Sequence, residues 1–173
     1  MIEDEIKNRF KNYDVSTKEF TLNGLHTFAR VVNVIDGDTI VCIIPLFDHY
    51  FKFSIRLNGI DTYEIRSKNP KLKYVALQAK YKLLNLVMNK NDDIVPVNYT
   101  SNEIINMLKE HIYIVWLECI NFDKYGRVLA DVKLTQNDKH TFSTIMINSN
   151  LAYRYNGHTK LSEDEQIKLI EIK

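Results

Sequence analysis

The chain has 173 residues, of which 45% are hydrophobic and 26% are charged, and its formal net charge is +1. This composition is ordinary for a soluble globular protein. The near-neutral total excludes a binding mode that rests on net charge, so a charged partner would have to be attracted by a local surface.

The amino-terminal sequence, MIEDEIKNRF, carries acidic residues where a signal peptide has positive charge followed by an apolar stretch. No window of the sequence approaches the apolar length that spans a bilayer. Cys42 and Cys119 each lie in an apolar run, which favours buried free thiols over a disulfide. We therefore expect a soluble, intracellular protein with no membrane partner.

The first predicted element is a short amphipathic helix, because Ile2, Ile6 and Phe10 have helical spacing. It belongs to a polar segment, 1–25, that we interpret as an N-terminal arm before a single domain, 26–173. Three β-branched and aromatic runs then follow, FARVVNVID, TIVCIIPLF and YFKFSIRLNGID, separated by DG and DH pairs. They predict two hairpins that form a meander.

Beyond Pro70 the spacing of apolar residues in LKYVALQAKYKLLNLVMNK predicts a long helix. A short helix capped by Ser101 follows, then two strands, IYIVWLECINF and RVLADVKL. TFSTIMINSN predicts another helix, and a last helix is capped by Ser162. Together these elements predict an α+β fold with a five-stranded barrel of OB type and about three packed helices, plus the arm and the inserted helix.

Charged residues mark the turn IDGDT at 35–39. The pair Asp36-Gly37 can form a type I′ turn without any help from Asp38. Strands are depleted in aspartate, so Asp38 at the start of the next strand indicates a function in addition to the turn.

Three further segments place charged or aromatic side chains at strand ends or turns: SIRLNGIDTYEI, FDKYGRVL and LAYRYNGHTK. Each has a structural alternative, which is a solvated Arg–carboxylate pair, a hairpin turn or an ordinary core edge, respectively. A barrel meander can nevertheless bring such strand ends to one rim.

The residue types at these strand ends are those that phosphodiester hydrolysis requires. Aspartate and carbonyl oxygens suit a hard cation such as Ca²⁺, and arginine binds phosphate oxygens in a bidentate manner. A carboxylate beside the metal can deprotonate a water molecule. No Ser–His–Asp or Cys–His arrangement and no glycine-rich phosphate loop competes with this interpretation.

The motifs IDGDT, IRLNGIDTYE and DKYGRVLADV, followed by LAYRY, resemble those of the staphylococcal nuclease (thermonuclease) family over about residues 28–172. The resemblance implies a Ca²⁺-dependent nuclease that hydrolyses DNA, RNA or both with little base specificity. Mg²⁺ or Mn²⁺ could substitute for Ca²⁺. The alternative is a weak or inactive module of the same fold that binds nucleic acid or protein. A monomer is expected.

The resemblance also implies roles for individual residues. Asp38 and Asp61 would bind the metal through their carboxylates, and Thr62 would bind it through its backbone carbonyl. Glu64 would act as general base on a water beside the metal. Four residues would contact the substrate, namely Lys124, Tyr125, Tyr153 and Tyr155. Two residues would grip the phosphate and stabilise the transition state, namely Arg56 and Arg127.

The sequence departs from the family in two places. Tyr63 stands where the family usually has proline, and a tyrosine there could either loosen Glu64 or be pinned by packing. The stretch of about 91–111 is longer than in compact bacterial enzymes and is interpreted as an insertion. The acids and arginines of the motifs are all retained, which favours the enzyme over the binding module.

Overall fold

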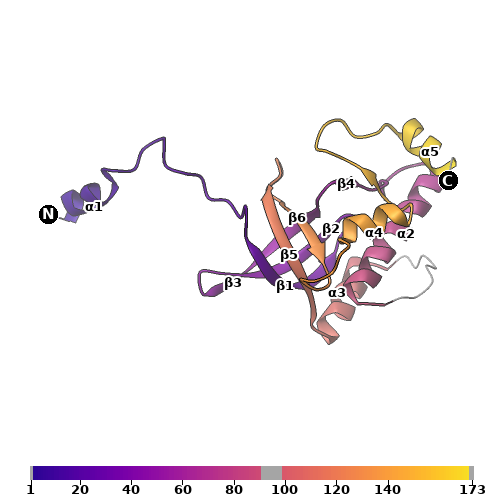
Figure 1. The fold of residues 1–173 in the computed structure, drawn as a ribbon, viewed down its shortest axis with the longest axis horizontal. Coiled ribbons are helices and arrows are strands. Elements are labelled where there is room, and N and C mark those ends of the chain that lie inside the picture. Colours follow the sequence, from indigo (N-terminus) through magenta and orange to yellow (C-terminus); the bar gives the residue numbers. More distant parts are fainter. Residues whose placement is uncertain (1, 91–98, 172–173) are drawn as a thin grey trace.

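The structure is a computed structural model that describes residues 2–90 and 99–171. Its elements are shown in Figure 1 and are, in chain order, α1 (Ile2–Phe10), β1 (His26–Val34), β2 (Thr39–Leu46), β3 (His49–Leu57), β4 (Ile60–Asp61), α2 (Pro70–Val87), α3 (Ser101–Glu110), β5 (Tyr113–Phe122), β6 (Val128–Lys133), α4 (Phe142–Asn148), β7 (Tyr153–Arg154) and α5 (Glu163–Glu171).

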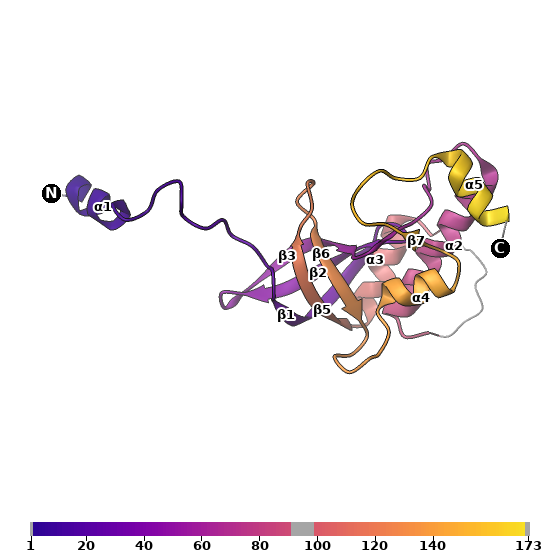
Figure 2. The ribbon, with the colours of Figure 1, turned by 45° about the horizontal axis from the view of Figure 1, so that its top comes forward.

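Five of the strands form a closed barrel in the order β1-β2-β3-β6-β5, with β5 pairing back to β1. Neighbouring strands are antiparallel except for β3 and β6, which run parallel where Ile55, Arg56 and Leu57 face 128–130. The prediction of an α+β fold around a five-stranded OB-type barrel is therefore confirmed. Helices α2, α3 and α4 lie on one side of the barrel (Figure 1), and α5 packs against α2 (Figure 2).

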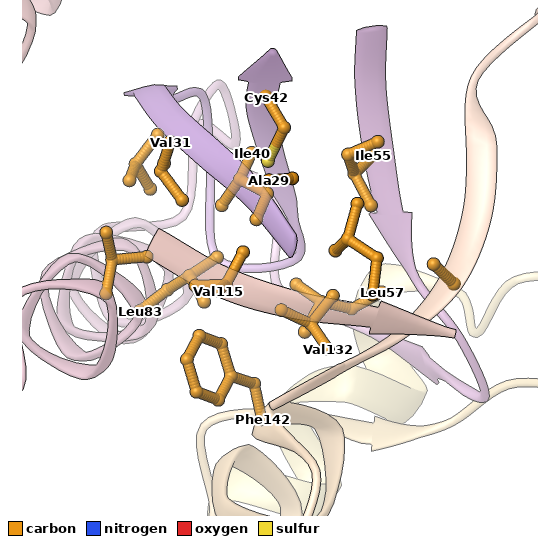
Figure 3. Packing of buried hydrophobic residues seen from close by; sticks show 14 of the residues in the cluster. Ala29, Val31, Ile40, Cys42, Ile55, Leu57, Leu83, Val115, Val132 and Phe142 are labelled. Carbon is orange, nitrogen blue, oxygen red and sulfur yellow. The ribbon is translucent and has the colours of Figure 1, made fainter. Parts of the chain in front are cut away.

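The barrel is filled by β-branched and other apolar side chains that alternate along the strands, as Figure 3 shows. Leu83 of α2 and Phe142 of α4 pack against these strand residues and are themselves buried. Cys42 and Cys119 are buried, free thiols, as the sequence predicts. This packed interior fixes the strand ends that carry the charged motifs.

The turn chemistry differs from the prediction at one hairpin. Phe47 and Asp48, between β2 and β3, have φ angles of 51° and 60°, as a type I′ turn requires. The type I′ turn predicted for Asp36-Gly37 is wrong, because neither residue has a positive φ. Gly37 is needed for space instead, since a Cβ on it would lie 2.6 Å from the Cβ of Ala79 on α2.

Side-chain caps set the starts of four helices, and that of α4 is Thr141. The Asn69 side chain accepts hydrogen bonds from the first turn of α2. Thr100 and Glu103 form a capping box on α3, so the predicted cap at Ser101 is wrong by one residue. Ser162 caps α5 as predicted: its hydroxyl accepts the backbone N–H of Glu165, and the Glu165 carboxylate accepts the backbone N–H of Ser162. Of the predicted insertion, residues 91–98 lie outside the described part of the chain.

Helix α1 lies apart from the barrel at the end of an extended segment (Figures 1 and 2). It has no buried residue, and its Ile2, Ile6 and Phe10 are exposed. The chain first enters the main core at Leu22. Over the described residues, no helix has the length and apolar character needed to cross a membrane. The boundary between an arm, 1–25, and a domain, 26–173, stays a prediction.

Candidate functional site

The turn between β1 and β2 presents Asp38 to the interior of a cleft. Its carboxylate is 4% exposed and accepts hydrogen bonds from the Thr39 hydroxyl (2.9 Å) and from the backbone N–H (3.1 Å) and hydroxyl (3.0 Å) of Thr62. Burial of a carboxylate is costly unless it is hydrogen-bonded or paired. These contacts therefore fix the orientation of the buried Asp38 carboxylate.

Arg56 of β3 lies between two aspartates. β3 pairs with β2 so that Arg56 stands opposite Thr39, directly after Asp38. Its guanidinium contacts Asp38 Oδ1 through Nη1, and Nη2 lies 2.6 Å from Asp61 Oδ1 and 3.0 Å from the carbonyl oxygen of Ile60. All three charged side chains are buried, so the pairing compensates much of their desolvation.

A two-stranded sheet of β4 and β7 fixes Asp61. In this sheet Asp61 stands opposite Tyr153, whose hydroxyl donates a 2.6 Å hydrogen bond to Asp61 Oδ2. Burial, together with the Asp61 carboxylate, raises the pKa of Tyr153 above its ordinary value, so the phenol remains a donor. Sequence patterns did not predict this sheet, because each strand has only two residues and hence no alternation to detect.

The loop after Asp61 exposes Glu64 and buries Tyr63. The Glu64 carboxylate opens toward solvent, and Lys160 Nζ lies 3.2 Å from its Oε1. Tyr63 packs edge-on against Tyr153, with ring centroids 5.9 Å apart, in a small second core that also contains Leu72. Of the two alternatives for Tyr63, the structure therefore supports the second: packing holds the ring in place.

The turn between β5 and β6 orients Arg127. Its Nε lies 2.7 Å from Asp123 Oδ2, and its guanidinium lies 5.5 Å from the centre of the Tyr125 ring. Asp123 also accepts the backbone N–H groups of Tyr125 and Arg127. Partial burial opposes the charge of Asp123, but these hydrogen bonds hold its pKa below the ordinary value. Lys124 lies over the same ring, 5.1 Å from its centre.

Two clefts meet at this site. The first, of about 440 Å³, is lined by the predicted metal and catalytic residues, namely Asp38, Arg56, Asp61, Thr62, Glu64 and Arg127. The second, of about 600 Å³, contains three of the predicted substrate residues, namely Lys124, Tyr125 and Tyr155. Both clefts are lined by Arg56, Arg127 and Lys160. Tyr153 lies below them, buried, with its hydroxyl on Asp61.

Four charged residues that line the first cleft are not among the predicted site residues, namely Asp36, Arg66, Lys80 and Lys160. Burial raises the pKa of Asp36, although the positive charges of Arg56 and Arg127 act in the opposite direction. Lys160 is the last residue of the segment LAYRYNGHTK, but its partner Glu64 lies 96 residues away, so the segment alone does not indicate the contact. Asp36 lies in the motif IDGDT, where the sequence indicates a turn residue.

The donor set of the first cleft fits a hard divalent cation. Asp38 and Asp61 are buried carboxylates that converge on one positive charge, the guanidinium of Arg56. Among the described residues no three His, Cys, Asp or Glu side chains form a ready metal cluster. Further ligands would therefore be carbonyl and water oxygens, which Ca²⁺ accepts readily.

Comparison with protein families matches residues 54–173 to the staphylococcal nuclease homologues. The matched range begins within β3, so it includes Arg56, Asp61, Glu64 and Arg127, while Asp38 precedes it. No curated protein gave a match. Because the matched residues make up more than half of the chain, the protein belongs to the family of staphylococcal nuclease homologues.

Proposed function

We propose that the protein is a nuclease that uses Ca²⁺, or Mg²⁺ or Mn²⁺ in its place, to hydrolyse phosphodiester bonds of DNA, RNA or both. One observation carries the proposal: two buried aspartates, two arginines and one exposed glutamate line the same cleft. These groups suit a cation and phosphate oxygens rather than base edges, so base specificity should be slight.

Asp38 and Asp61 would hold the cation through their carboxylates, and Thr62 through its backbone carbonyl. The cation would supply positive charge that polarises a phosphoryl oxygen. Tyr153 would act as a positioning residue, because its hydrogen bond to Oδ2 fixes the orientation of the Asp61 carboxylate.

Arg56 and Arg127 would bind the phosphate that is cleaved. Both line both clefts, so a phosphate at the junction lies within reach of two planar, bidentate donors. Asp123 limits the motion of Arg127 by holding its Nε. Preorganised donors of this kind stabilise the charge that develops on the phosphoryl oxygens in the transition state.

Glu64 would accept the proton of the attacking water. Its carboxylate is exposed and lies on a loop that the buried ring of Tyr63 holds in position. The hydroxide so formed would attack phosphorus and expel the 5′-oxygen, which leaves a 3′-phosphate. Lys124, Tyr125 and Tyr155, on the second cleft, would contact the nucleotide beside the scissile bond.

A cleavage assay tests this proposal directly. Labelled single-stranded DNA and RNA are incubated with the protein in Ca²⁺ and in chelator, and the product ends are identified. We expect cleavage that requires the cation and yields 3′-phosphates. Binding of nucleic acid without cleavage under any of the three cations would contradict the proposal and support the binding module instead.

We further propose that the protein acts as an intracellular monomer through the domain 26–173.

A further inference from the structure

Lys160 makes two ion pairs across the site from a distant part of the chain. Its Nζ lies 3.1 Å from Asp61 Oδ1 and 3.2 Å from Glu64 Oε1. Asp61 is almost fully buried, with 2% of its side chain exposed, whereas 52% of the Lys160 side chain is exposed. One ammonium thus joins the proposed cation ligand to the proposed general base.

Both oxygens of Asp61 are already engaged by protein donors. Oδ2 accepts the Tyr153 hydroxyl, and Oδ1 faces both Arg56 and Lys160. A metal ion that binds Asp61 must therefore displace or repel at least one of the cationic donors. Two positive groups and a divalent cation around one carboxylate oxygen repel one another strongly at these distances.

Lys160 is the donor that can leave at the lower cost. Arg56 is buried and is also bound to Asp38 and to the Ile60 carbonyl, so its guanidinium has little room to move. Lys160 is half exposed and its ammonium can return to water along a flexible side chain.

We propose that Lys160 is a tethered counter-ion that competes with the divalent cation for Asp61 and thereby sets the cation affinity of the site. Its ammonium neutralises Asp61 and Glu64 before the cation binds and withdraws when the cation arrives. This inference rests on the proposed function only in taking Asp61 as a cation ligand. Withdrawal would also free the Glu64 carboxylate, which couples cation binding to exposure of the base.

The test is Ca²⁺ binding to the full chain, measured by isothermal titration calorimetry without nucleic acid. Lys160→Met should bind Ca²⁺ about fivefold more tightly than the parent, a coupling of ordinary size between two ligands of one site. Lys80→Met is the matched control, because Lys80 lines the same cleft and no ion pair joins it to Asp61 or Glu64 in the described structure. It removes the same charge and should change the affinity less.

A second readout guards against an effect on folding. In chelator, Lys160→Met should melt at a lower temperature than the parent, because Asp61 and Glu64 lose a counter-ion. In saturating Ca²⁺ the deficit should shrink or reverse, since tighter binding adds more stability. A misfolded variant would not recover in this way.

Three results would overturn the inference: an affinity of Lys160→Met no tighter than that of the parent, an equal gain in Lys80→Met, or no Ca²⁺ binding by either the parent or Lys160→Met. Cleavage is not part of this test. A protein that shows the Lys160 effect but never cuts nucleic acid would sink the proposed function and leave the inference intact.

Discussion

At the scale of single residues, the site is organised around buried charges that the fold has to compensate. Asp38, Arg56 and Asp61 are all nearly inaccessible to water, and the guanidinium is the group that joins the two carboxylates. Removing one partner from such a buried cluster leaves uncompensated charge, which costs far more than the pair itself contributes. Arg56 therefore has a structural role in addition to the proposed catalytic one.

Arg56→Met should destabilise the protein by about 3–5 kcal/mol in the absence of divalent cations, because Asp38 and Asp61 lose their shared partner. Urea unfolding in chelator measures this loss. Arg127→Met is the control: Arg127 is partly exposed and, within the described part of the chain, forms an ion pair with one carboxylate, Asp123, so its loss should cost about 1 kcal/mol or less. Equal stability of Arg56→Met and the parent would contradict the assignment of Arg56 as the central counter-charge.

The residues of this cluster could be predicted from sequence because they lie in ordered motifs. The contacts of the Tyr63 ring and of Lys160 could not, because each depends on chain segments far apart in sequence. Tyr63 contacts Tyr153 of β7, and Lys160, in the loop between β7 and α5, contacts Glu64. The spacing of apolar residues in these segments does not predict either contact.

At the scale of elements, the turn between β1 and β2 can pack closely against helix α2 because Gly37 has no side chain. Gly37 faces Ala79 and Thr62 so closely that an added Cβ would lie 2.6 Å from the Ala79 Cβ and 3.0 Å from Thr62 Cγ2. The turn that carries Asp38, the loop that carries Thr62 and the helix are thus in direct contact. The sequence indicates a turn as the reason for Gly37. Its close approach to Ala79 could not be predicted, because the two residues are far apart along the chain.

Gly37→Ala should destabilise the protein by about 1–3 kcal/mol, because the turn or α2 must move to admit the methyl group. Ala79→Gly removes the facing methyl and by itself should cost about 1 kcal/mol through helix propensity. In a double-mutant cycle measured by urea unfolding, the two costs should sum to more than the cost of the double variant. Strict additivity would mean that the two residues do not press on one another.

At the scale of the whole molecule, the barrel order and the helix positions follow from patterns that the sequence displays over long segments. Alternating strands and a long amphipathic helix were sufficient to predict the OB-type barrel and α2. Elements of two residues, such as β4 and β7, carry no such pattern. The predicted cap of α3 was wrong by one residue because Thr100 and Ser101 are both residue types that cap helices well.

Two separate hydrophobic cores support different parts of the candidate site. The barrel core holds β2, which begins directly after Asp38, and β3, which carries Arg56. The second core, built from Tyr63, Leu72, Ala76 and Tyr153, supports the loop that carries Glu64. The arm contributes to neither core before Leu22. Activity should therefore depend on the barrel, α2 and α5 together.

The most direct measurement of the central claim is the single-turnover cleavage rate of Glu64→Gln against the parent in Ca²⁺, with nucleic-acid binding and thermal unfolding measured on both. We expect at least a hundredfold loss of rate, of about the size that a general base supplies, with binding and folding nearly unchanged. A parent that cleaves in Ca²⁺ and a Glu64→Gln variant that cleaves equally fast would contradict it.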